Sequence, residues 1–390
     1  MEKKVGIGEY SFELLKKFEE FKISNLKFQI YLKDPPNGDM PKERDGWKYI
    51  VVKPRKMWTQ FALPLHLFIG SPRPDVFFTP SHYAPRFAIM PTAISIMDLS
   101  YVHFPQLFNT HDLYQLTNWT KYSARQAKHI FTISNASKDD IIKEYHVAPD
   151  DVTVTYLGIR DEAKKKTMSQ HELIQKYGIS KNYILFVGTL QPRKNITRLI
   201  EAFALMQRGP VRGFPSTDAR LAPSANKLRV SGSLSTSATP KDLELVIVGK
   251  KGWLYEDILA APEKYGVMDS VKFLDFVPTE DLPSLYEHAL CYVLPSLYEG
   301  FGLPVLEAMK CGCPVITSKV SSLPEAGGDA ALYVDPEHVE DIAQKIQQVI
   351  SDEKLRDEMR KKGLEHIKKF SWEKAAKETL EVLMKLGTNR

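Results

Sequence analysis

Cysteine is scarce in this sequence, and its three residues, Cys291, Cys311 and Cys313, are an odd number. A disulfide-stapled secreted domain is therefore excluded, and so few thiols indicate a reducing compartment. Cys311 and Cys313 form a Cys-x-Cys pair, but a structural zinc site needs four ligands, and no Cys or His pair with suitable spacing lies nearby. We interpret the pair as small, nearly apolar residues in a packed turn, and we predict no metal site.

Long hydrophobic runs are also absent, since no stretch reaches the ~18 to 20 apolar residues that span a bilayer. The N-terminus, MEKKVGIGEY, has no apolar segment of the kind found in secretory signals, so we expect a cytoplasmic protein. One stretch, Trp47 to Phe68, is aromatic and basic. We interpret it as two buried strands joined by a solvated turn, and peripheral contact with the inner face of a membrane stays open as an alternative.

A strong excess of one charge is missing as well, because the formal net charge is +5 at pH 7. Most of this excess falls in residues 208–240, where five Arg and Lys residues face a single Asp. No cluster of cations elsewhere could track phosphates, so nucleic acid is not an expected partner. Residues 208–240 are also rich in Ser, Pro, Gly and Ala, and we predict a flexible surface insertion because they can bury little apolar surface.

The sequence does contain the composition of a folded protein, with 390 residues, 43% of them hydrophobic and 26% charged. This length predicts two or three domains. A helix near Tyr10–Phe21 is followed by short apolar or β-branched runs. They occupy Lys27–Leu32, Trp47–Val52, Val76–Phe78, Ala93–Met97, His129–Ile133 and Val152–Tyr156. Strands that alternate with helical patterns are typical of a parallel α/β sheet.

A second alternating set begins after a polar, lysine-rich stretch near residues 160–180. Its runs are Tyr183–Val187, Leu243–Val248, Val271–Leu274, Cys291–Leu294 and Val315–Ile316. The sequence therefore predicts an α/β protein of two Rossmann-like domains, residues 1–170 and residues 171–370, with the insertion 208–240 in the second. Residues 371–390 form a predicted C-terminal helix, which begins at the capping residue Ser371 and packs back towards the N-terminal domain.

Ligands of open parallel sheets bind beyond the carboxyl ends of the strands, so the loops that follow each predicted strand are candidate sites. The loop after Tyr183–Val187 reads GTLQPRKN, with Gly188 at its turn and Arg193 and Lys194 just before a helix near Ile196. Two cations beside a helix N-terminus form an anion site. A solvated, charged loop is the alternative interpretation.

The segment PSLYEGFGLPVLEAMKCGCPVITS, residues 295–318, carries the most chemistry. Gly300 and Gly302 allow backbone amides to approach a ligand, and Pro304 is placed as at a helix start. Glu299 and Glu307 stand on either side of this turn, with Glu307 expected in the first helical turn. Carboxylates accept paired hydrogen bonds from a diol, while free amides and the helix dipole favour phosphate. Alternatively, Glu307 only stabilises the helix dipole and Glu299 is solvated.

Residues 295–318 resemble the signature of the family 4 retaining glycosyltransferases of the GT-B fold, in which seven residues separate two glutamates, here Glu299 and Glu307. The likeness extends through GIGEYSFELL (6–15), PSHYAPRF (80–87), FTISNASKDDI (131–141), GTLQPRKN (188–195), VIVGKKGW (246–253) and FSWEKAA (370–376). The resemblance implies two Rossmann-like domains that face each other across a cleft. It also implies sugar transfer from a nucleotide-diphosphate donor, with retention at the anomeric carbon and without an obligatory metal or other cofactor.

The resemblance also implies roles for individual residues. Glu307 would hold the donor ribose, Lys194 and Arg193 the diphosphate beside Gly188, and Glu299 and Asp98 would lie near the reacting centre. The donor sugar would contact the backbone of Gly300, Phe301, Gly302 and Leu303. Apart from the resemblance, we expect the base at the turn of Phe276 and Val277. The acceptor side of the cleft would include Gly6, Gly8, His82 and Ser134. Fixed cations and amides can stabilise the departing diphosphate in place of a metal ion.

Three departures from the family pattern affect this assignment. Many relatives carry His-Asp where this chain has Met97-Asp98, so His82 and His103 are candidates for the missing histidine. Thr189 stands where many relatives have an arginine. Only Met1–Val5 precede the glycine loop, so the first strand of the fold is expected to be missing or cut short.

The sequence leaves the substrates open: mannose or glucose as the sugar, UDP or GDP as the nucleotide, and a glycan, a lipid-linked saccharide or a small molecule as the acceptor. Polysaccharide biosynthesis is the expected setting, and monomer and homodimer stay equally open. A GT-B epimerase or phosphorylase and a non-catalytic nucleotide-sugar-binding protein are the alternatives. A NAD-dependent dehydrogenase is disfavoured, because no Gly-x-Gly-x-x-Gly follows a strand with an acidic residue ~20 positions later.

Overall fold

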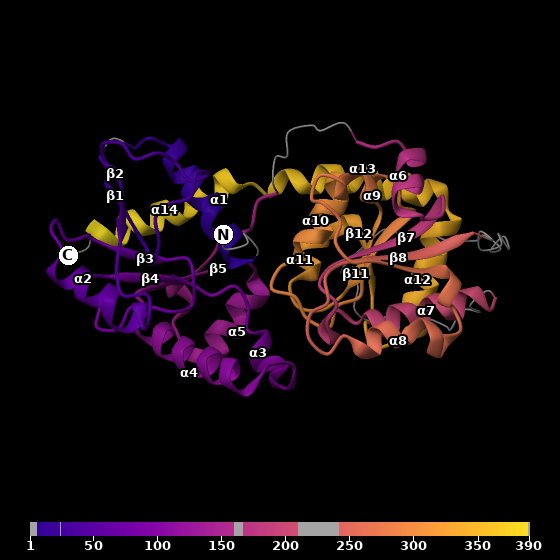
Figure 1. Ribbon diagram of the computed structural model, residues 1–390, viewed down its shortest axis with the longest axis horizontal. Helices are drawn as coiled ribbons and strands as arrows, with labels where there is room; N and C mark the ends of the chain where they lie inside the picture. The colour runs from indigo at the N-terminus through magenta and orange to yellow at the C-terminus, as the bar shows by residue number, and fades with distance from the viewer. Residues whose placement is uncertain (1–5, 24, 160–166, 210–241, 389–390) are drawn as a thin grey trace. The chain divides into compact units, whose positions relative to one another are not determined.

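The computed structural model describes residues 6–23, 25–159, 167–209 and 242–388 (Figure 1). The chain divides into two compact units. The N-terminal unit comprises Met1–Glu162, Tyr298–Leu303 and Lys368–Arg390, and the C-terminal unit comprises Ala163–Leu297 and Pro304–Ile367. The first division thus falls a few residues before the expected position 170. Residues 298–303 belong to the N-terminal unit, although we expected the whole of 171–370 to form the second domain.

Two of the predicted features lie outside the described residues. One is the stretch Met1–Val5 that precedes the glycine loop, and the other is the predicted insertion from residue 210 onward. Among the residues that the structure describes, no helix is both long enough and apolar enough to cross a bilayer.

The N-terminal unit contains two separate parallel sheets. Four strands form the larger sheet in sequential order, β3 (Phe77–Thr79), β4 (Thr92–Ser95), β5 (His129–Thr132) and β6 (Val152–Val154). The strands β1 (Phe28–Leu32) and β2 (Trp47–Val51) pair only with each other. The predicted runs therefore do form strands, but alternation along the sequence did not reveal that the first two have a sheet of their own.

The helices of this unit include one that corrects a prediction. Its helices are α1 (Ile7–Glu20), α2 (Leu63–Ile69), α3 (Ser100–His103), α4 (Thr110–Gln126), α5 (Asn135–Tyr145) and α14 (Trp372–Thr388). A π-helix, Trp58–Ala62, leads directly into α2, so the second strand that we predicted within Trp47–Phe68 is wrong. The apolar residues there follow helical spacing: Leu63 and Leu67 are buried, whereas Leu65 is 60% exposed.

Helix starts follow local sequence signals. The side chains of Asn109 and Ser134 cap α4 and α5 by accepting hydrogen bonds from backbone amides three residues later. Ser371 accepts a hydrogen bond from the Lys374 amide at 3.1 Å, which confirms its predicted capping role at the start of α14. Ser169 and Glu172 form a reciprocal capping box at α6 (Gln170–Tyr177).

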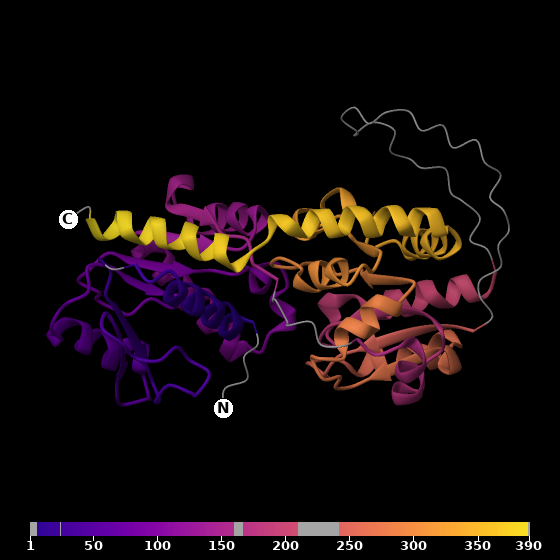
Figure 2. The same cartoon turned by 90° about the horizontal axis from the view of Figure 1, so that it is seen from above.

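The terminal helix α14 packs within the N-terminal unit, where Figure 2 shows it in yellow alongside the indigo and purple elements. The rings of Tyr10 and Trp372 lie 6.2 Å apart, and Leu383 packs against Ala93 and Phe131. A Cβ at Gly158 would come within 2.1 Å of the Trp372 nitrogen, so only glycine permits this approach. The last helix thereby covers the sheet formed by β3 to β6.

The C-terminal unit is built on one parallel sheet of six strands in the order β12-β11-β10-β7-β8-β9. The strands are β7 (Asn182–Val187), β8 (Leu243–Val248), β9 (Val271–Leu274), β10 (Cys291–Leu294), β11 (Val315–Ser318) and β12 (Ala331–Val334). We did not predict β12. The chain order reverses between the neighbours β7 and β10, and this switch point is where such sheets bind ligands.

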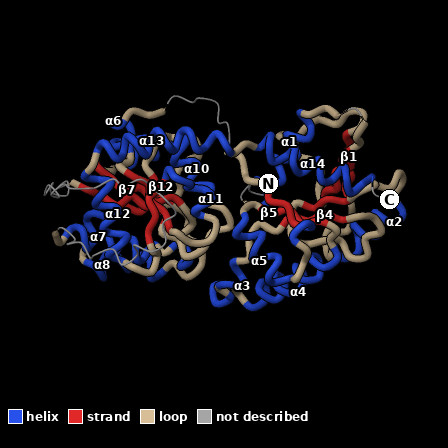
Figure 3. Tube along the Cα trace, turned by 180° about the vertical axis from the view of Figure 1, so that it is seen from behind, coloured by secondary structure: helices blue, strands red, loops and turns tan. Residues whose placement is uncertain are grey.

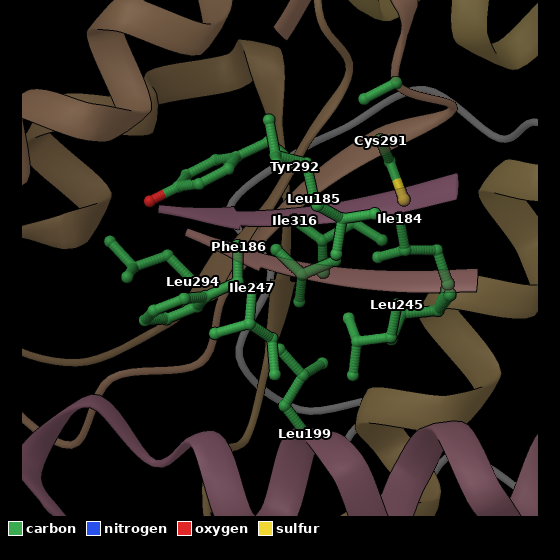
Figure 4. Close-up of a cluster of buried hydrophobic side chains, with 14 of the residues drawn as sticks. Ile184, Leu185, Phe186, Leu199, Leu245, Ile247, Cys291, Tyr292, Leu294 and Ile316 are labelled. Atoms are coloured by element: carbon green, nitrogen blue, oxygen red, sulfur yellow. The ribbon is translucent and has the colours of Figure 1, made fainter. Parts of the chain in front are cut away.

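Helices cover both faces of this sheet (Figure 3). They are α6, α7 (Ile196–Gln207), α8 (Glu256–Tyr265), α9 (Leu282–His288), α10 (Leu303–Lys310), α11 (Leu323–Gly327), α12 (Val339–Ser351) and α13 (Glu353–His366). Four consecutive residues of β7, from Tyr183 to Phe186, are completely buried, as a strand covered on both faces requires. Figure 4 shows Ile184, Leu185 and Phe186 among side chains from the neighbouring strands.

The cysteines contribute to this core as small apolar residues. All three are free thiols, and Cys291 and Cys313 are buried in the cluster. Burial raises the pKa of Cys291 to about 12, so its thiol stays protonated at neutral pH. These observations agree with the packing role that we predicted for the Cys-x-Cys pair.

Candidate functional site

The loop after β7 lies against the loop after β8 in the C-terminal unit. The amides of Gly188 and Leu190 donate to the carbonyls of Val248 and Lys250, each at 2.9 Å, and the Gly252 amide donates to the Leu190 carbonyl at 3.0 Å. A Cβ at Gly249 would stand 1.8 Å from the Gly188 oxygen. The two loops can run this close only because glycine occupies position 249.

Arg193 and Lys194 form part of a short 3-10 helix, Pro192–Lys194, directly before α7. The Lys194 side chain is only 9% exposed, and its Cε lies 3.8 Å from the position that a Cβ on Gly188 would occupy. The lysine is thus folded over the glycine turn. This arrangement places a shielded ammonium group at the N-terminal end of a 12-residue helix, where positive charge and the helix dipole attract the same anion.

Asn195, which sequence reasoning missed, connects the loops after β7 and β10. It adopts left-handed backbone angles with φ of 60°, and its Nδ2 donates to the carbonyls of Pro295 at 2.9 Å and Pro336 at 2.7 Å. The Leu297 amide donates to the Arg193 carbonyl at 2.9 Å. These hydrogen bonds therefore connect the loop of residues 188–195 to the start of the paired-glutamate segment, at the switch point of the sheet.

Glu307 lies on α10, which begins at Leu303. The helix has no acidic residue in its first turn, so Glu307 belongs to the second turn and our placement in the first was wrong. Its half-buried carboxylate accepts a hydrogen bond from the hydroxyl of Tyr286, on α9, at 3.4 Å. Burial raises the pKa of Tyr286 well above its usual value, so this residue is a neutral donor that orients the carboxylate. No sequence signal linked Tyr286 to Glu307.

The turn that we predicted for the base carries one buried and one exposed side chain. Val277 is 6% exposed and belongs to the core, whereas Phe276 is 65% exposed. The ammonium of Lys250 stands 4.7 Å from the centroid of the Phe276 ring. Phe276 therefore offers an aromatic face at the carboxyl end of the sheet, and Val277 supports the turn from beneath.

The other signature glutamate belongs to the segment Tyr298–Leu303 of the N-terminal unit, where Glu299 is buried. The Tyr298 hydroxyl donates to Asp140 Oδ2 at 2.8 Å and accepts from the Leu99 amide at 3.4 Å. His103 Nε2 also donates to Asp140, at 2.8 Å. His103 is thus engaged with this carboxylate.

Gly300 lies directly against Asp98. A Cβ at this glycine would stand 2.9 Å from the Asp98 Cβ and 3.0 Å from its Oδ2. Asp98 Oδ1 accepts from the Ser100 amide at 2.8 Å, which holds the carboxylate in place. The structure therefore brings together Asp98 and the Glu299-Gly300 turn, three of the residues assigned to the reaction from the sequence.

Phe301, Gly302 and Leu303 follow in the same turn. The ring of Phe301 is buried, stacks on Tyr156 at 5.7 Å and meets Phe370 edge-on at 5.6 Å. Gly302 has φ of 108°, a conformation that favours glycine. The side chain of Phe301 thus anchors the turn within the N-terminal unit.

His82 lies in the loop after β3, and its Nδ1 is buried without a hydrogen-bond partner among the described residues. Burial lowers the pKa of His82, while the negative charge of Asp98 acts in the opposite direction. The imidazole is therefore neutral at pH 7 and retains one unused polar atom. Between the two histidine candidates, this favours His82 over His103.

The remaining candidates lie at helix starts of the N-terminal unit. Gly6 has φ of 56° and precedes α1, and Gly8 lies in the first turn of that helix. Ser134 is completely buried, and its Oγ accepts from the Ser137 amide at 3.1 Å. The hydroxyl of Ser134 therefore caps α5. Within the described part of the chain, no three His, Cys, Asp or Glu side chains gather as a group that could hold a metal ion.

Two family models match this chain, and together they cover most of it. The model described as Glycosyltransferase Family 4 matches residues 32–163, and the one described as Glycosyl transferases group 1 matches residues 219–366. The chain belongs to the family 4, group 1 glycosyltransferases. The second match contains the paired-glutamate segment. It also includes residues 219–240 of the predicted insertion.

Curated relatives of this glycosyltransferase include mannosyltransferases. It is 29% identical to O-antigen chain mannosyltransferase B of Escherichia coli over 96% of its own length and 94% of that protein's. It is also 29% identical to the serotype-specific mannosyltransferase WbdA of Escherichia coli, over 71% of its own length but only 33% of that longer protein.

Solved structures share the fold of this glycosyltransferase. Anabaena Alr3699/HepE in complex with UDP and glucose aligns over 98% of this chain and 97% of its own, with a TM-score of 0.70 and 18% identity. Two parallel α/β units and this likeness show the GT-B fold.

Proposed function

We propose that this glycosyltransferase transfers mannose from a nucleotide-diphosphate sugar to a saccharide acceptor, with retention at the anomeric carbon and without a metal ion. The names of the mannosyltransferase relatives support the choice of sugar. The observation that carries the proposal is the loop Gly188–Lys194, because it sets a shielded ammonium at a helix N-terminus on the switch point of the sheet.

The C-terminal unit has the chemistry that a nucleotide diphosphate requires. Lys194, Arg193 and the amides at the start of α7 would stabilise the negative charge that develops when the diphosphate departs. Fixed positive charges of this kind can take the electrostatic role that a metal ion has in other transferases. Glu307, held by Tyr286, would accept hydrogen bonds from the two ribose hydroxyls.

The N-terminal unit has the chemistry that the sugar and the incoming hydroxyl require. In the proposed reaction the bond from C1 of the sugar to the β-phosphate oxygen breaks, and a bond from C1 to the acceptor oxygen forms on the same face. The proton of the acceptor hydroxyl passes to the departing diphosphate. Asp98, Glu299 and the unused Nδ1 of His82 would orient the sugar hydroxyls during this exchange.

Calorimetric binding of UDP, GDP and ADP tests the donor assignment, first with magnesium and then with EDTA. We expect one nucleotide to bind equally in both conditions. Glu307→Ala should lose about 1.5 to 3 kcal/mol of binding free energy, as expected for hydrogen bonds to a charged group. Glu340→Ala, at an exposed glutamate near the start of α12, is the matched control and should bind as the wild type does.

Analysis of the reaction product tests the proposed stereochemistry and the identity of the sugar. NMR of the product's anomeric signal distinguishes retention from inversion, and a comparison of mannose and glucose donors tests the sugar. Binding that requires magnesium would overturn the metal-independent mechanism. Nucleotide binding without transfer or donor hydrolysis would favour the non-catalytic alternative.

A further inference from the structure

A pocket of about 540 Å³ opens in the N-terminal unit, separate from the residues that we assign to the donor. Its wall combines the end of β1 at Lys33, the loop after β2 at Arg55, the π-helix that begins at Trp58, the loop around Arg86 and Trp119 of α4. Pockets of this volume are typical of sites for small molecules. All of its lining residues belong to one unit of the chain.

The pocket carries positive charge. Lys33, Arg55 and Arg86 line it, and no Asp or Glu does. Asp34 stands beside it and accepts from Arg55 Nε at 2.8 Å, so it offsets one of the three charges. Hydrogen bonding to Arg55 is the main reason that the pKa of Asp34 is lowered, so the carboxylate stays ionised. The net charge at the wall therefore favours an anionic ligand, and arginine matches phosphate oxygens through paired N–H donors.

The pocket is also lined by aromatic rings. Tyr83 and Trp119 meet edge-on with their centroids 5.7 Å apart, and the indole nitrogen of Trp58 donates to the Val52 carbonyl at 3.1 Å. These contacts hold two indoles in position. Phe61 and Phe87, also in the lining, are 62% and 79% exposed. Trp58 and Trp119 are both partly exposed, so these two fixed indoles offer flat apolar faces on which the C–H face of a sugar can stack.

The backbone around the pocket is strained at two positions. Met57 and Phe87 both line it and have φ of 53° and 57°, values that are rare for residues with a side chain. The π-helix beside Met57 is an uncommon element that is frequently found at functional sites. Such conformations cost of order 1–3 kcal/mol each and cluster at ligand-binding sites.

The pocket adjoins the candidate reaction residues through one loop. Tyr83 lines the pocket, and its ring meets the ring of His82 edge-on at 4.8 Å. His82 in turn interacts electrostatically with Asp98. A saccharide whose reacting hydroxyl approaches His82 and Asp98 would thus have its next sugar units beside Tyr83.

We propose that this pocket binds a phosphorylated sugar unit of the acceptor, with its phosphate on Arg86 and Lys33 and its ring on Trp58 and Trp119. The assignment of the pocket to the acceptor rests on the proposed function. The phosphate ester is the recognised group, whether a soluble saccharide or a lipid-linked one carries it.

Fluorine NMR of the chain labelled with 5-fluorotryptophan tests this proposal directly. The sequence has five tryptophans, and Trp58→Phe and Trp119→Phe assign the two resonances of the pocket. The probes are α-D-mannose 1-phosphate, methyl α-D-mannoside and inorganic phosphate, each with the donor site saturated by the nucleotide that binds it. We expect mannose 1-phosphate to shift both pocket resonances and to bind at least tenfold more tightly than the other two probes.

Substitutions then test the charge. Arg86→Gln and, separately, Lys33→Gln should weaken mannose 1-phosphate at least fivefold without changing the affinity for the nucleotide. Arg125→Gln, at an exposed arginine in the last turn of α4, is the matched control and should change neither. Equal affinity for methyl mannoside or for inorganic phosphate would overturn the proposal, as would the absence of any shift at Trp58 and Trp119.

A vesicle arm distinguishes a lipid surface from a saccharide. Vesicles of phosphatidylcholine and phosphatidylglycerol present phosphate without sugar. If they shift the pocket resonances and mannose 1-phosphate does not, the surface contacts a membrane and the proposal fails. Failure of the proposed function would give a different result. No nucleotide would bind to the protein, and the tryptophan resonances would still report whether mannose 1-phosphate binds in the pocket without nucleotide.

Discussion

Gly300 and Asp98 lie so close that a methyl group on the glycine would stand 2.9 Å from the Asp98 Cβ. The two residues are far apart in the sequence, yet both belong to the N-terminal unit. The Ser137 hydroxyl donates to the Met97 carbonyl at 3.0 Å and lies 3.5 Å from the Gly300 carbonyl, its weaker acceptor. The Glu299-Gly300 turn thus packs against the loop after β4 and the start of α5.

Gly300→Ala is expected to reduce sugar transfer at least tenfold. The added Cβ would contact both Cβ and Oδ2 of Asp98 at 3.0 Å or less, so the turn or the carboxylate must move. Steady-state transfer rates measure the effect. Gly38→Ala is the control, because its Cβ would meet no atom within 4 Å. A Gly300→Ala enzyme with wild-type kcat would show that this contact does not matter for the reaction.

Asn195→Gly is expected to destabilise the C-terminal unit and to weaken nucleotide binding. Glycine tolerates the φ of 60° but leaves the buried carbonyls of Pro295 and Pro336 without their donor. An unsatisfied buried group costs about 1–3 kcal/mol, so urea unfolding should show a loss of that size. The control is Asn118→Ala, which removes an exposed amide from α4 without the backbone entropy cost that glycine has in a helix. An unchanged free energy of unfolding for Asn195→Gly would contradict a stabilising role for the two hydrogen bonds of Asn195.

Tyr286→Phe is expected to weaken nucleotide binding by about three- to tenfold. A hydrogen bond to a charged group contributes about 1.5–3 kcal/mol, but Tyr286 affects the nucleotide only indirectly, by orienting Glu307, so only part of this energy is lost from binding. The ring stays in the core, and only the hydroxyl that donates to Glu307 is lost. Calorimetry of the double variant with Glu307→Ala gives the check. If Tyr286 acts through Glu307, the second substitution adds nothing to Glu307→Ala, whereas additive losses would exclude the positioning role.

His82→Gln is expected to make the stability of the protein less sensitive to acid. Burial lowers the pKa of His82 in the folded state below the ordinary 6.5, so the unfolded chain binds more protons as the pH falls. The neutral histidine therefore contributes stability above its unfolded pKa, and this contribution is lost as the pH falls through the folded value. Thermal melting from about pH 7.5 to about pH 5 should show a steeper fall for the wild type than for His82→Gln. Parallel curves would contradict a buried neutral His82.

The activity of His82 variants provides a second readout. His82→Ala removes the unused Nδ1, whereas His82→Gln can return one polar atom. We expect His82→Ala to lower kcat about fivefold and His82→Gln to recover part of it, because one hydrogen bond is worth about 1 kcal/mol. His103→Gln is the comparison, since His103 already donates to Asp140. Equal losses in all three variants would remove His82 from the reaction.

Local patterns of the sequence predicted much of this protein correctly. The runs of apolar and β-branched residues marked eleven of the twelve strands found among the described residues, because burial within a parallel sheet produces such runs. Glycines and prolines marked the loops at the carboxyl ends of the strands, since turns need particular backbone angles. The likeness of residues 295–318 to the family signature, together with the order of the other motifs, identified the family.

Contacts between distant residues decided the rest. Three features have no local signature: the pairing of β1 with β2 alone, the close contact of Gly300 with Asp98, and the hydrogen bond from Tyr286 to Glu307. Each depends on which surfaces meet after the chain has folded, because burial and hydrogen-bond partners are properties of the packed units. The sequence by itself determined the family and the fold, and it predicted the loops at the carboxyl ends of the strands from which the candidate site is built. Only the tertiary structure decided which side chains hold those residues in position, and it alone showed the charged, aromatic pocket beside Tyr83.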